Sequence, residues 1–305
     1  MNRRDFIRKG GSAGLGMGLI PAGFFSLNRA ESMTARELNS YLRELVPVEE
    51  PSVDKIIIGD PGTVIRKIGT AWMPYWDTLK EAHARGVNTM VVHEPTFYTH
   101  RDLEETAWDW HAAPPAGKEM YTRQVEAKKA WILENEMVVI RCHDVLDKIK
   151  GYGIPYAFGR GLGFQDTEIA HSRPYYNVYR TEPQPAGELA QVIASRLKEV
   201  GQPGIAFYGD PGYQVRSVGV GTGCICDPMH YMELEMDLAI AIDDSISTWI
   251  QTTYAEDTGR PLVVVNHGTS EEFGMREFSA RLNSSLEFQE VVHFPQGCTY
   301  RWVTA

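Results

Sequence analysis

Val263-Val-Val-Asn-His267-Gly-Thr-Ser-Glu271-Glu-Phe-Gly274 joins a predicted strand to a predicted helix. The apolar β-branched run is typical of a buried strand, and the polar residues after it indicate a helix start, with Thr269 or Ser270 as N-cap. Residues four apart on a helix share a face, so His267 and Glu271 are predicted to point at one spot. Imidazole and carboxylate together suit Zn, Fe, Mn or Ni. A solvated turn would explain the same pair, so a metal site requires further ligands there.

The composition is that of a globular protein large enough for two lobes. The chain has 305 residues, of which 43% are hydrophobic and 23% charged, and single cores usually stop growing near this length. A net charge of −10 argues against nucleic acid as the main partner, because binding there relies on Lys and Arg. The four cysteines lack the CxxC pairing of a zinc site. We expect mostly free thiols, located in strands.

The N-terminal residues 1–30 are expected to be an export signal rather than part of the fold. Arg3-Arg4-Asp5-Phe6-Ile7 precedes a weakly apolar, glycine-rich segment, residues 10–25, and this pattern resembles a twin-arginine (Tat) signal. The segment is short and interrupted for a membrane span, and no other stretch of the sequence could cross a bilayer. We therefore expect export by the twin-arginine route, to the periplasm or the cell exterior.

A pattern that occurs twice predicts two related halves. Gly59-Asp-Pro-Gly-x-x-x-Arg66-x-x-Gly69 matches Gly209-Asp-Pro-Gly-x-x-x-Arg216-x-x-Gly219 position for position. Agreement at six fixed positions is not expected by coincidence. We therefore predict two similar α/β lobes, residues 31–160 and 161–305, with the C-terminal part of the second able to pack back on the first.

Strands and helices are predicted to alternate in both halves. Helices are expected at residues 34–45, 75–85, 119–134, 227–236 and 245–255. Strands are expected at residues 56–58, 64–68, 88–92, 137–141, 238–242 and 261–265. This alternation gives βαβ units with largely parallel strands, so the predicted fold class is α/β.

Three stretches fall outside this alternation. Residues 108–115 are aromatic and proline-rich, which indicates an insertion or a lid over the site. Residues 151–163 are glycine-rich and are expected to form a loop in which Arg160 could line the pocket. Gly219-Val-Gly-Thr-Gly223 lacks the GxGxxG spacing of a dinucleotide site. We interpret it as tight packing near the site.

Four of the predicted strands end in side chains that bind metals or carry protons. These ends are His93-Glu94, His143-Asp144, Asp243-Asp244 and His267. The repeat offset places Asp243 at the position of His93. Because ligand sites in α/β sheets lie beyond the carboxyl ends of strands, four such ends favour a functional site over ordinary solvated loops.

These residues resemble the Nif-three-like dinuclear metal-centre proteins, which include GTP cyclohydrolase type 2 homologues. The resemblance covers about residues 50 to 305. The motifs that carry it are Val91-Val-His93-Glu94-Pro95-Thr-Phe97, His143-x-x-x-Asp147, Gly219-x-Gly-x-Gly223 and His267-x-x-x-Glu271-x-Phe-Gly274. The resemblance implies two similar lobes with two divalent metal ions between them, in a homo-oligomer that is a hexamer.

The resemblance also implies which residues bind metal. The positions that match family ligands are His93, Asp147, His267 and Glu271. His143 matches a histidine beside the ligands. The second histidine of the family is Glu94 here, which can still ligate a divalent metal but adds negative charge. The number of ions, one or two, and the choice among Zn, Fe and Mn therefore stay open.

Two interpretations of function follow. The first is a divalent-metal-dependent hydrolase that acts on a small molecule, namely a cyclic amide or amidine, a nucleotide-like compound or a phosphoester. His143 or Asp244 would then carry a proton near the metals. The alternative is a non-catalytic metal-binding or regulatory protein. An open coordination position distinguishes the two, because structural metal sites are closed.

Overall fold

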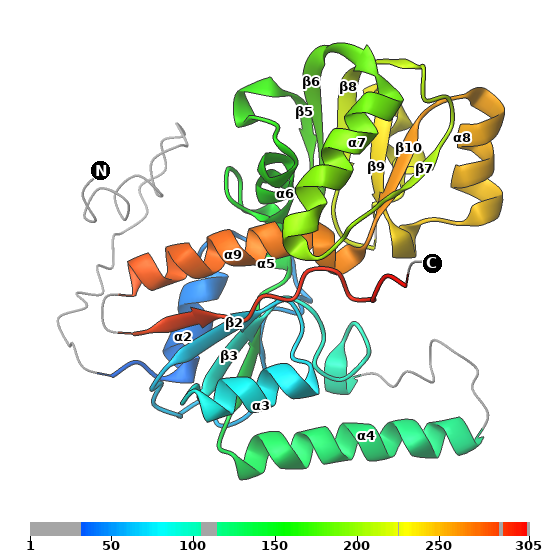
Figure 1. Ribbon diagram of the computed structural model, residues 1–305. Coiled ribbons are helices and arrows are strands. Elements are labelled where there is room, and N and C mark those ends of the chain that lie inside the picture. Colours follow the sequence, from blue (N-terminus) through cyan, green and yellow to red (C-terminus); the bar gives the residue numbers. More distant parts are fainter. Residues whose placement is uncertain (1–31, 105–114, 225, 287–288, 304–305) are drawn as a thin grey trace.

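The first of two sheets forms the core of one lobe (Figure 1). The computed structural model describes residues 32–104, 115–224, 226–286 and 289–303. In order across the sheet, the strands are β1 (Ile56–Ile58), β4 (Val138–Arg141), β3 (Thr89–Val92), β2 (Ile68–Ala71) and β11 (Val291–His293). β1 is antiparallel to β4, and the other neighbours are parallel.

Helices cover both faces of this sheet. Leucines and alanine of α2 (Ala35–Arg43) share one apolar cluster with residues of α9 (His267–Ser285). The opposite face is covered by α3 (Trp76–Ala84) and by α4 (Pro115–Glu134), which contributes Ile132. The lobe is therefore a three-layer α/β unit with its strands buried on both faces.

The second sheet forms the core of the other lobe. Its strands, in order, are β5 (Ile169–Arg173), β6 (Tyr176–Pro185), β8 (Gln214–Gly221), β9 (Leu238–Ile242), β10 (Leu262–Val265) and β7 (Ala206–Tyr208). Strands β8, β9 and β10 run parallel to one another, whereas β6 is antiparallel to β5 and β8, and β7 is antiparallel to β10. The α/β class and the two lobes are confirmed. The prediction of largely parallel strands misses the hairpin β5–β6, whose short turn forces antiparallel pairing.

The repeated sequence pattern forms the same turn in both lobes. Gly59 and Gly209 have φ angles of 103° and 88°, in the left-handed region that favours glycine. A Cβ would lie 2.5 Å from the carbonyl oxygen of Met137 at the first and 2.4 Å from that of Arg260 at the second. The aspartate after each glycine accepts a hydrogen bond of 2.8 Å from the N–H two residues on. The internal repeat is thus a repeat of structure.

Helix α9 runs between the two lobes and packs against α6 (Ile154–Leu162) (Figure 1). The sequence predicted a loop at residues 151–163, and this prediction is wrong. The glycines of α6 serve close packing rather than a loop, since a Cβ at Gly161 would lie 2.6 Å from the ring of Phe273 on α9. Arg160 does not line the cavity described below but pairs with Asp166 and Glu277.

Gly274→Ala tests this close helix contact. A Cβ at Gly274 would lie 2.4 Å from Cδ1 and 3.0 Å from Cα of Ile154. We expect the free energy of unfolding to fall by about 1–3 kcal/mol, the usual cost of overpacking, although alanine is the better helix former. Chemical denaturation measures this. In the control Gly204→Ala the new methyl group meets Trp302 at an ordinary 3.7 Å, so equal destabilisation of both variants would contradict the packing explanation.

Other helices differ from prediction in their ends or in their type. Helix α9 starts at His267 with Asn266 as N-cap, not at Thr269 or Ser270. The helix predicted at residues 227–236 is the 3₁₀ helix Pro228–Leu234, and that at 245–255 is a π turn followed by α8 (Thr253–Thr258). All four cysteines are free thiols, as predicted, but none lies in a strand.

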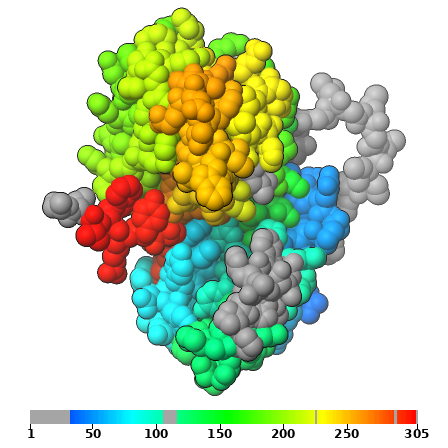
Figure 2. Space-filling model, turned by 90° about the vertical axis from the view of Figure 1, so that its right-hand side faces the viewer, coloured from blue at the N-terminus to red at the C-terminus, as the bar shows by residue number. Residues whose placement is uncertain are grey.

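The C-terminal segment returns from the second lobe to the first. After α9, strand β11 pairs with β2 in parallel, Val291 opposite Ile68. Figure 2 shows the last residues, in red, at the level where the two lobes meet. Within the described ranges, no helix combines the length and apolar character that crossing a membrane requires. The predicted signal at residues 1–30 and most of the predicted lid lie outside the described residues.

Candidate metal centre

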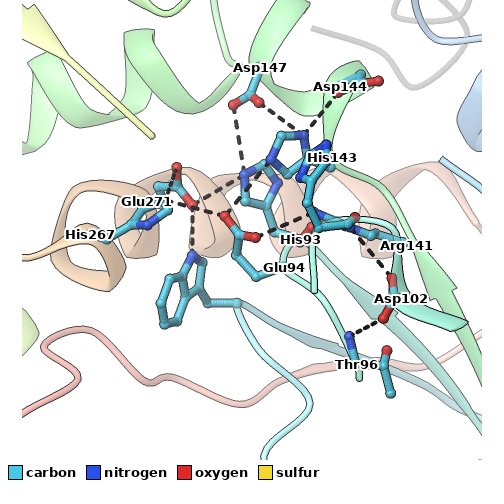
Figure 3. A network of polar contacts seen from close by, with 12 residues as sticks. His93, Glu94, Thr96, Asp102, Arg141, His143, Asp144, Asp147, His267 and Glu271 are labelled. Atoms are coloured by element: carbon cyan, nitrogen blue, oxygen red, sulfur yellow. Dashed lines mark hydrogen bonds and ion pairs between the residues drawn. The ribbon is translucent and has the colours of Figure 1, made fainter. Parts of the chain in front are cut away.

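The polar strand ends meet in one buried cluster between the lobes (Figure 3). His93 and Glu94 follow β3, while His143 follows β4 and precedes α5 (Asp144–Lys148), which carries Asp147. From the second lobe come Asp244, after β9, and His267 and Glu271 on the first turns of α9. The structure therefore brings all of the sequence-predicted site residues together, namely His93, Glu94, His143, Asp147, Asp244, His267 and Glu271.

Glu271 lies at the centre of the cluster, between two histidines. Its Oε2 is 3.2 Å from Nε2 of His93, and its Oε1 is 3.1 Å from Nε2 of His267. The side chain is only 1% exposed, and the indole N–H of Trp72 donates a 2.7 Å hydrogen bond to Oε2. The expected shared face of His267 and Glu271 is confirmed. Each carboxylate oxygen of Glu271 faces a different imidazole.

His93 is fully buried and has one nitrogen without a hydrogen-bond partner. Its Nδ1 contacts the carbonyl oxygen of Cys142 at 3.2 Å and must donate there. Its Nε2 finds no hydrogen bond among the described residues, although carboxylates lie 3.2 Å and 3.7 Å away. Burial opposes protonation, but Glu271 and Asp147 outweigh it and raise the pKa of His93 to about 10. The surroundings of Nε2 thus favour a positive charge.

His267 is oriented by a carboxylate on the side of its ring that faces away from the cluster. Its Nδ1 lies 2.9 Å from Oδ2 of Asp244 and donates there, so Nε2 faces the cluster. There, Oε1 of Glu271 and Oε1 of Glu94 lie at 3.1 Å and 3.2 Å. A histidine held by an outer carboxylate is the usual arrangement of a metal ligand.

Glu94 is held by a buried arginine. Arg141 is fully buried, and its Nη2 lies 3.4 Å from Oε2 of Glu94. The same guanidinium lies 3.5 Å from Asp102 and donates to the carbonyl of His93 at 3.0 Å. Burial raises the pKa of Glu94, but its neighbours, chiefly His267, lower it by more, so the pKa lies below its ordinary value. Glu94 therefore presents a charged Oε1 to the cluster while Arg141 neutralises its far side.

His143 forms the wall of the cluster next to Asp147. Its ring stacks on that of His93 with centroids 4.5 Å apart. Its Nδ1 lies 3.0 Å from Asp144 and 3.4 Å from Asp147, while its Nε2 lies 3.8 Å from Glu94. Burial raises the pKa of Asp147 above its ordinary value, against the opposing effect of the histidines. His143 is 17% exposed and is therefore in contact with solvent.

The cluster fits divalent metal ions. Two sets of ligand atoms lie within 4.8 Å of one another, His93 with His143 and Asp147, and His93 with Glu94 and Glu271. The unpartnered Nε2 of His93 faces carboxylate oxygens, and this arrangement is stabilised either by a proton on the ring or by a cation bound between them. Imidazole and carboxylate groups are ligands that divalent metal ions take in proteins.

A cavity of about 480 Å³ opens beside the cluster. Five cluster side chains line it directly, namely Glu94, His143, Asp147, Asp244 and His267. Other walls come from the segment that follows β3, from α4, and from Tyr175 and Cys224 of the second lobe. The size is that of a small-molecule site. One side of the cluster is therefore reachable by a ligand, while Glu271 and His93 form its buried side.

Three residues of the site were missed in the sequence. Trp72 directly follows the strand β2, and the strand-end rule applied to that strand would have pointed to it. Arg141 ends the buried run Val-Val-Ile-Arg, where a charge requires a partner. Asp54, whose carboxylate binds the backbone N–H groups of His143 and Val145, carries no comparable signal, because it precedes its strand.

Three solved structures with the same fold each match most of this chain. A Staphylococcus aureus hypothetical protein, SA1388, has a TM-score of 0.70 at 15% identity, covering 90% of this chain and all of its own. The protein ybgI, described as of unknown function, has a TM-score of 0.67 at 20% identity, covering 86% and 98%. Reduced HcgD from Methanocaldococcus jannaschii has a TM-score of 0.62 at 17% identity, covering 87% and 99%.

These identities establish a common fold and nothing finer. No match to a curated protein was found. The sequence profile described as Duf34/NIF3 (NGG1p interacting factor 3), however, matches residues 33–296, which is most of the chain. The matched range includes every cluster residue. The family expected from the His93, His143 and His267 motifs is confirmed, and the chain belongs to the Duf34/NIF3 family.

Proposed function

We propose that the cluster holds two divalent metal ions and that the protein is a metal-dependent hydrolase of a small molecule. The observation that carries the proposal is the position of Glu271, whose two oxygens face different histidines. One ion would be held by His93, Asp147 and Glu271, and the other by His267, Glu94 and Glu271. Glu271 would then be shared between them.

The chain supplies the remaining functions of such a site. Paired divalent cations supply Lewis acidity and lower the pKa of water. Trp72 fixes the rotamer of Glu271, and Asp244 fixes the tautomer of His267. We therefore assign Asp244 an orienting role. His143 and Asp244 both border the cavity. Asp244 is engaged by His267, so His143 is the better placed of the two predicted proton carriers.

The cavity supports a catalytic site over a purely structural one. Structural metal sites are closed by protein ligands, whereas catalytic sites keep an approach open. Here Glu94, His143, Asp147 and His267 all border the cavity, while the far side of the cluster is sealed by Trp72 and Arg141. Among the described residues, the cavity is thus the side from which a small molecule can approach and be positioned.

Metal content and hydrolysis, measured on the same preparations, test the proposal. We expect close to two equivalents of Fe or Mn per chain after anaerobic reconstitution, and hydrolysis of at least one cyclic amide or phosphoester that stops on chelation and returns with metal. His143→Gln should keep the metal and lose roughly 10²–10⁴-fold in rate, as for a lost general acid or base. Metal-loaded protein that hydrolyses none of these classes would favour the non-catalytic alternative.

A further inference from the structure

Lys128, on α4, is a buried lysine in the wall of the cavity. It is only 4% exposed, yet it borders the cavity. Its Nζ donates a 2.9 Å hydrogen bond to the carbonyl oxygen of Thr96, and among the described residues no carboxylate pairs with it. An ammonium group has three donors. Two N–H donors therefore remain for a ligand. Because the ammonium group is buried, its charge is costly unless a partner binds it.

The charges around Lys128 do not account for its position. Asp102 is the acidic group that acts on it, but burial outweighs that effect and lowers the pKa of Lys128 to about 8. The carboxylate of Asp102 is already engaged by the N–H groups of Thr96 and Phe97, at 2.6 Å and 2.9 Å, and by Arg141. An anion arriving in the cavity would meet a lysine without a committed counter-ion.

Aromatic rings line the same cavity. Tyr75, Tyr98 and Tyr175 border it, and Nζ of Lys128 lies 5.5 Å from the centroid of the Tyr98 ring. Tyr98 and Tyr175 have φ angles of 67° and 65°, in the left-handed region that bulky residues avoid. Such strain concentrates at ligand-binding sites. Flat aromatic walls suit a planar ring in the ligand.

We propose that the cavity binds a planar small molecule bearing a carboxylate or phosphate group, with that anion held by Lys128. The ring lies among the three tyrosines, and the rest of the molecule faces Glu94, His143 and His267 at the other wall. As a statement about the substrate this rests on the proposed hydrolase function. The anion site itself requires only Lys128 and the cavity.

Calorimetric titration of the full-length, metal-loaded protein with phenyl phosphate and with benzoate tests the site and separates phosphate from carboxylate. Lys128→Met should weaken binding of the preferred probe roughly 10- to 100-fold, because a hydrogen bond to a charged group is lost. Lys128→Arg should retain most of the affinity. The control Lys129→Met removes a neighbouring lysine that pairs with Glu126 outside the cavity, and it should bind as the wild type does.

A test in a variant that should lack metal excludes binding of the anion to the metal ions themselves. In Glu271→Ala, whose cluster should lack metal, Lys128→Met should still weaken probe binding by a similar factor. Lys128→Gln, which can keep the hydrogen bond to Thr96, replaces the Met variant if melting temperatures show that Met unfolds the protein. Unchanged affinity in the Lys128 variants, or no binding of either probe to the wild type, would overturn the anion site and leave the metal proposal untouched.

Discussion

Alanine at position 271 is expected to empty both metal positions at once. Among the described cluster residues, Glu271 alone lies within 3.2 Å of both His93 and His267, so its removal takes an oxygen donor from each ion. Because removing even an outer partner of a ligand costs 10–100-fold in affinity, we expect metal content well below one equivalent and hydrolysis at background. Elemental analysis of the purified, reconstituted variant gives the first quantity.

Two comparisons isolate the role of Glu271 from damage to the fold. Glu277→Ala removes a carboxylate from the same helix that pairs with Arg160 and Arg281 on the surface, and it should keep its metal. In Glu271→Ala the buried indole N–H of Trp72 loses its acceptor, which costs about 1–3 kcal/mol. Glu271→Gln retains that acceptor and separates the two effects. Full metal content in Glu271→Ala would rule out a shared ligand.

Glu94→Gln is expected to lose one of the two metal ions and to abolish most activity. Gln keeps an oxygen donor but loses the charge that faces His267 at 3.2 Å. The ion held by His93, Asp147 and Glu271 should stay. The competing role for Glu94 is a general base, in which case the variant would keep both ions and lose roughly 10²–10⁴-fold in rate. Metal counting on the Gln variant distinguishes the two, and full metal content with full rate contradicts both.

The contact with Arg141 favours the ligand role. A fully buried guanidinium lies 3.4 Å from the far oxygen of Glu94. It holds the carboxylate in place, whereas a general base would have to swing away from the metal. The contact with Arg141 also affects the design of the opposite test, in which Glu94 is replaced by histidine. Glu94→His should shift preference towards Zn, which favours imidazole, but it leaves Arg141 without one buried partner, a costly change. The double variant Glu94→His with Arg141→Met is therefore the better comparison.

The site could be predicted from the sequence because most of its residues follow a strand directly. Apolar β-branched runs such as the one that ends at Val92 are local patterns, and the rule that ligands gather at the carboxyl ends of strands turns four separate patterns into one site. The spacing of His267 and Glu271 is likewise local, set by one helical turn. This is why His93 and His267, distant in the chain, could be assigned to one cluster from the sequence alone.

The missed features depend on contacts that sequence patterns do not contain. Residues 151–163 look like a loop because their glycines are read as flexible, whereas Gly161 and Gly274 are small so that α6 and α9 can touch. Arg141 and Trp72 act by what they touch across the cluster, at 3.4 Å and 2.7 Å. The pairing of β11 with β2 joins residues 223 positions apart, as in the contact of Thr70 with His293. A local sequence pattern does not predict such a pairing.

That pairing has a consequence for how the protein is made. While the chain emerges from the ribosome, β2 is an unpaired edge strand until residues 291–293 appear, and closing so long a loop is slow. His93 and Asp147 are then synthesised well before His267 and Glu271. The newly made first half offers only part of the donor set. Under the proposed metal centre, metal insertion would therefore be a maturation step that follows completion of the polypeptide.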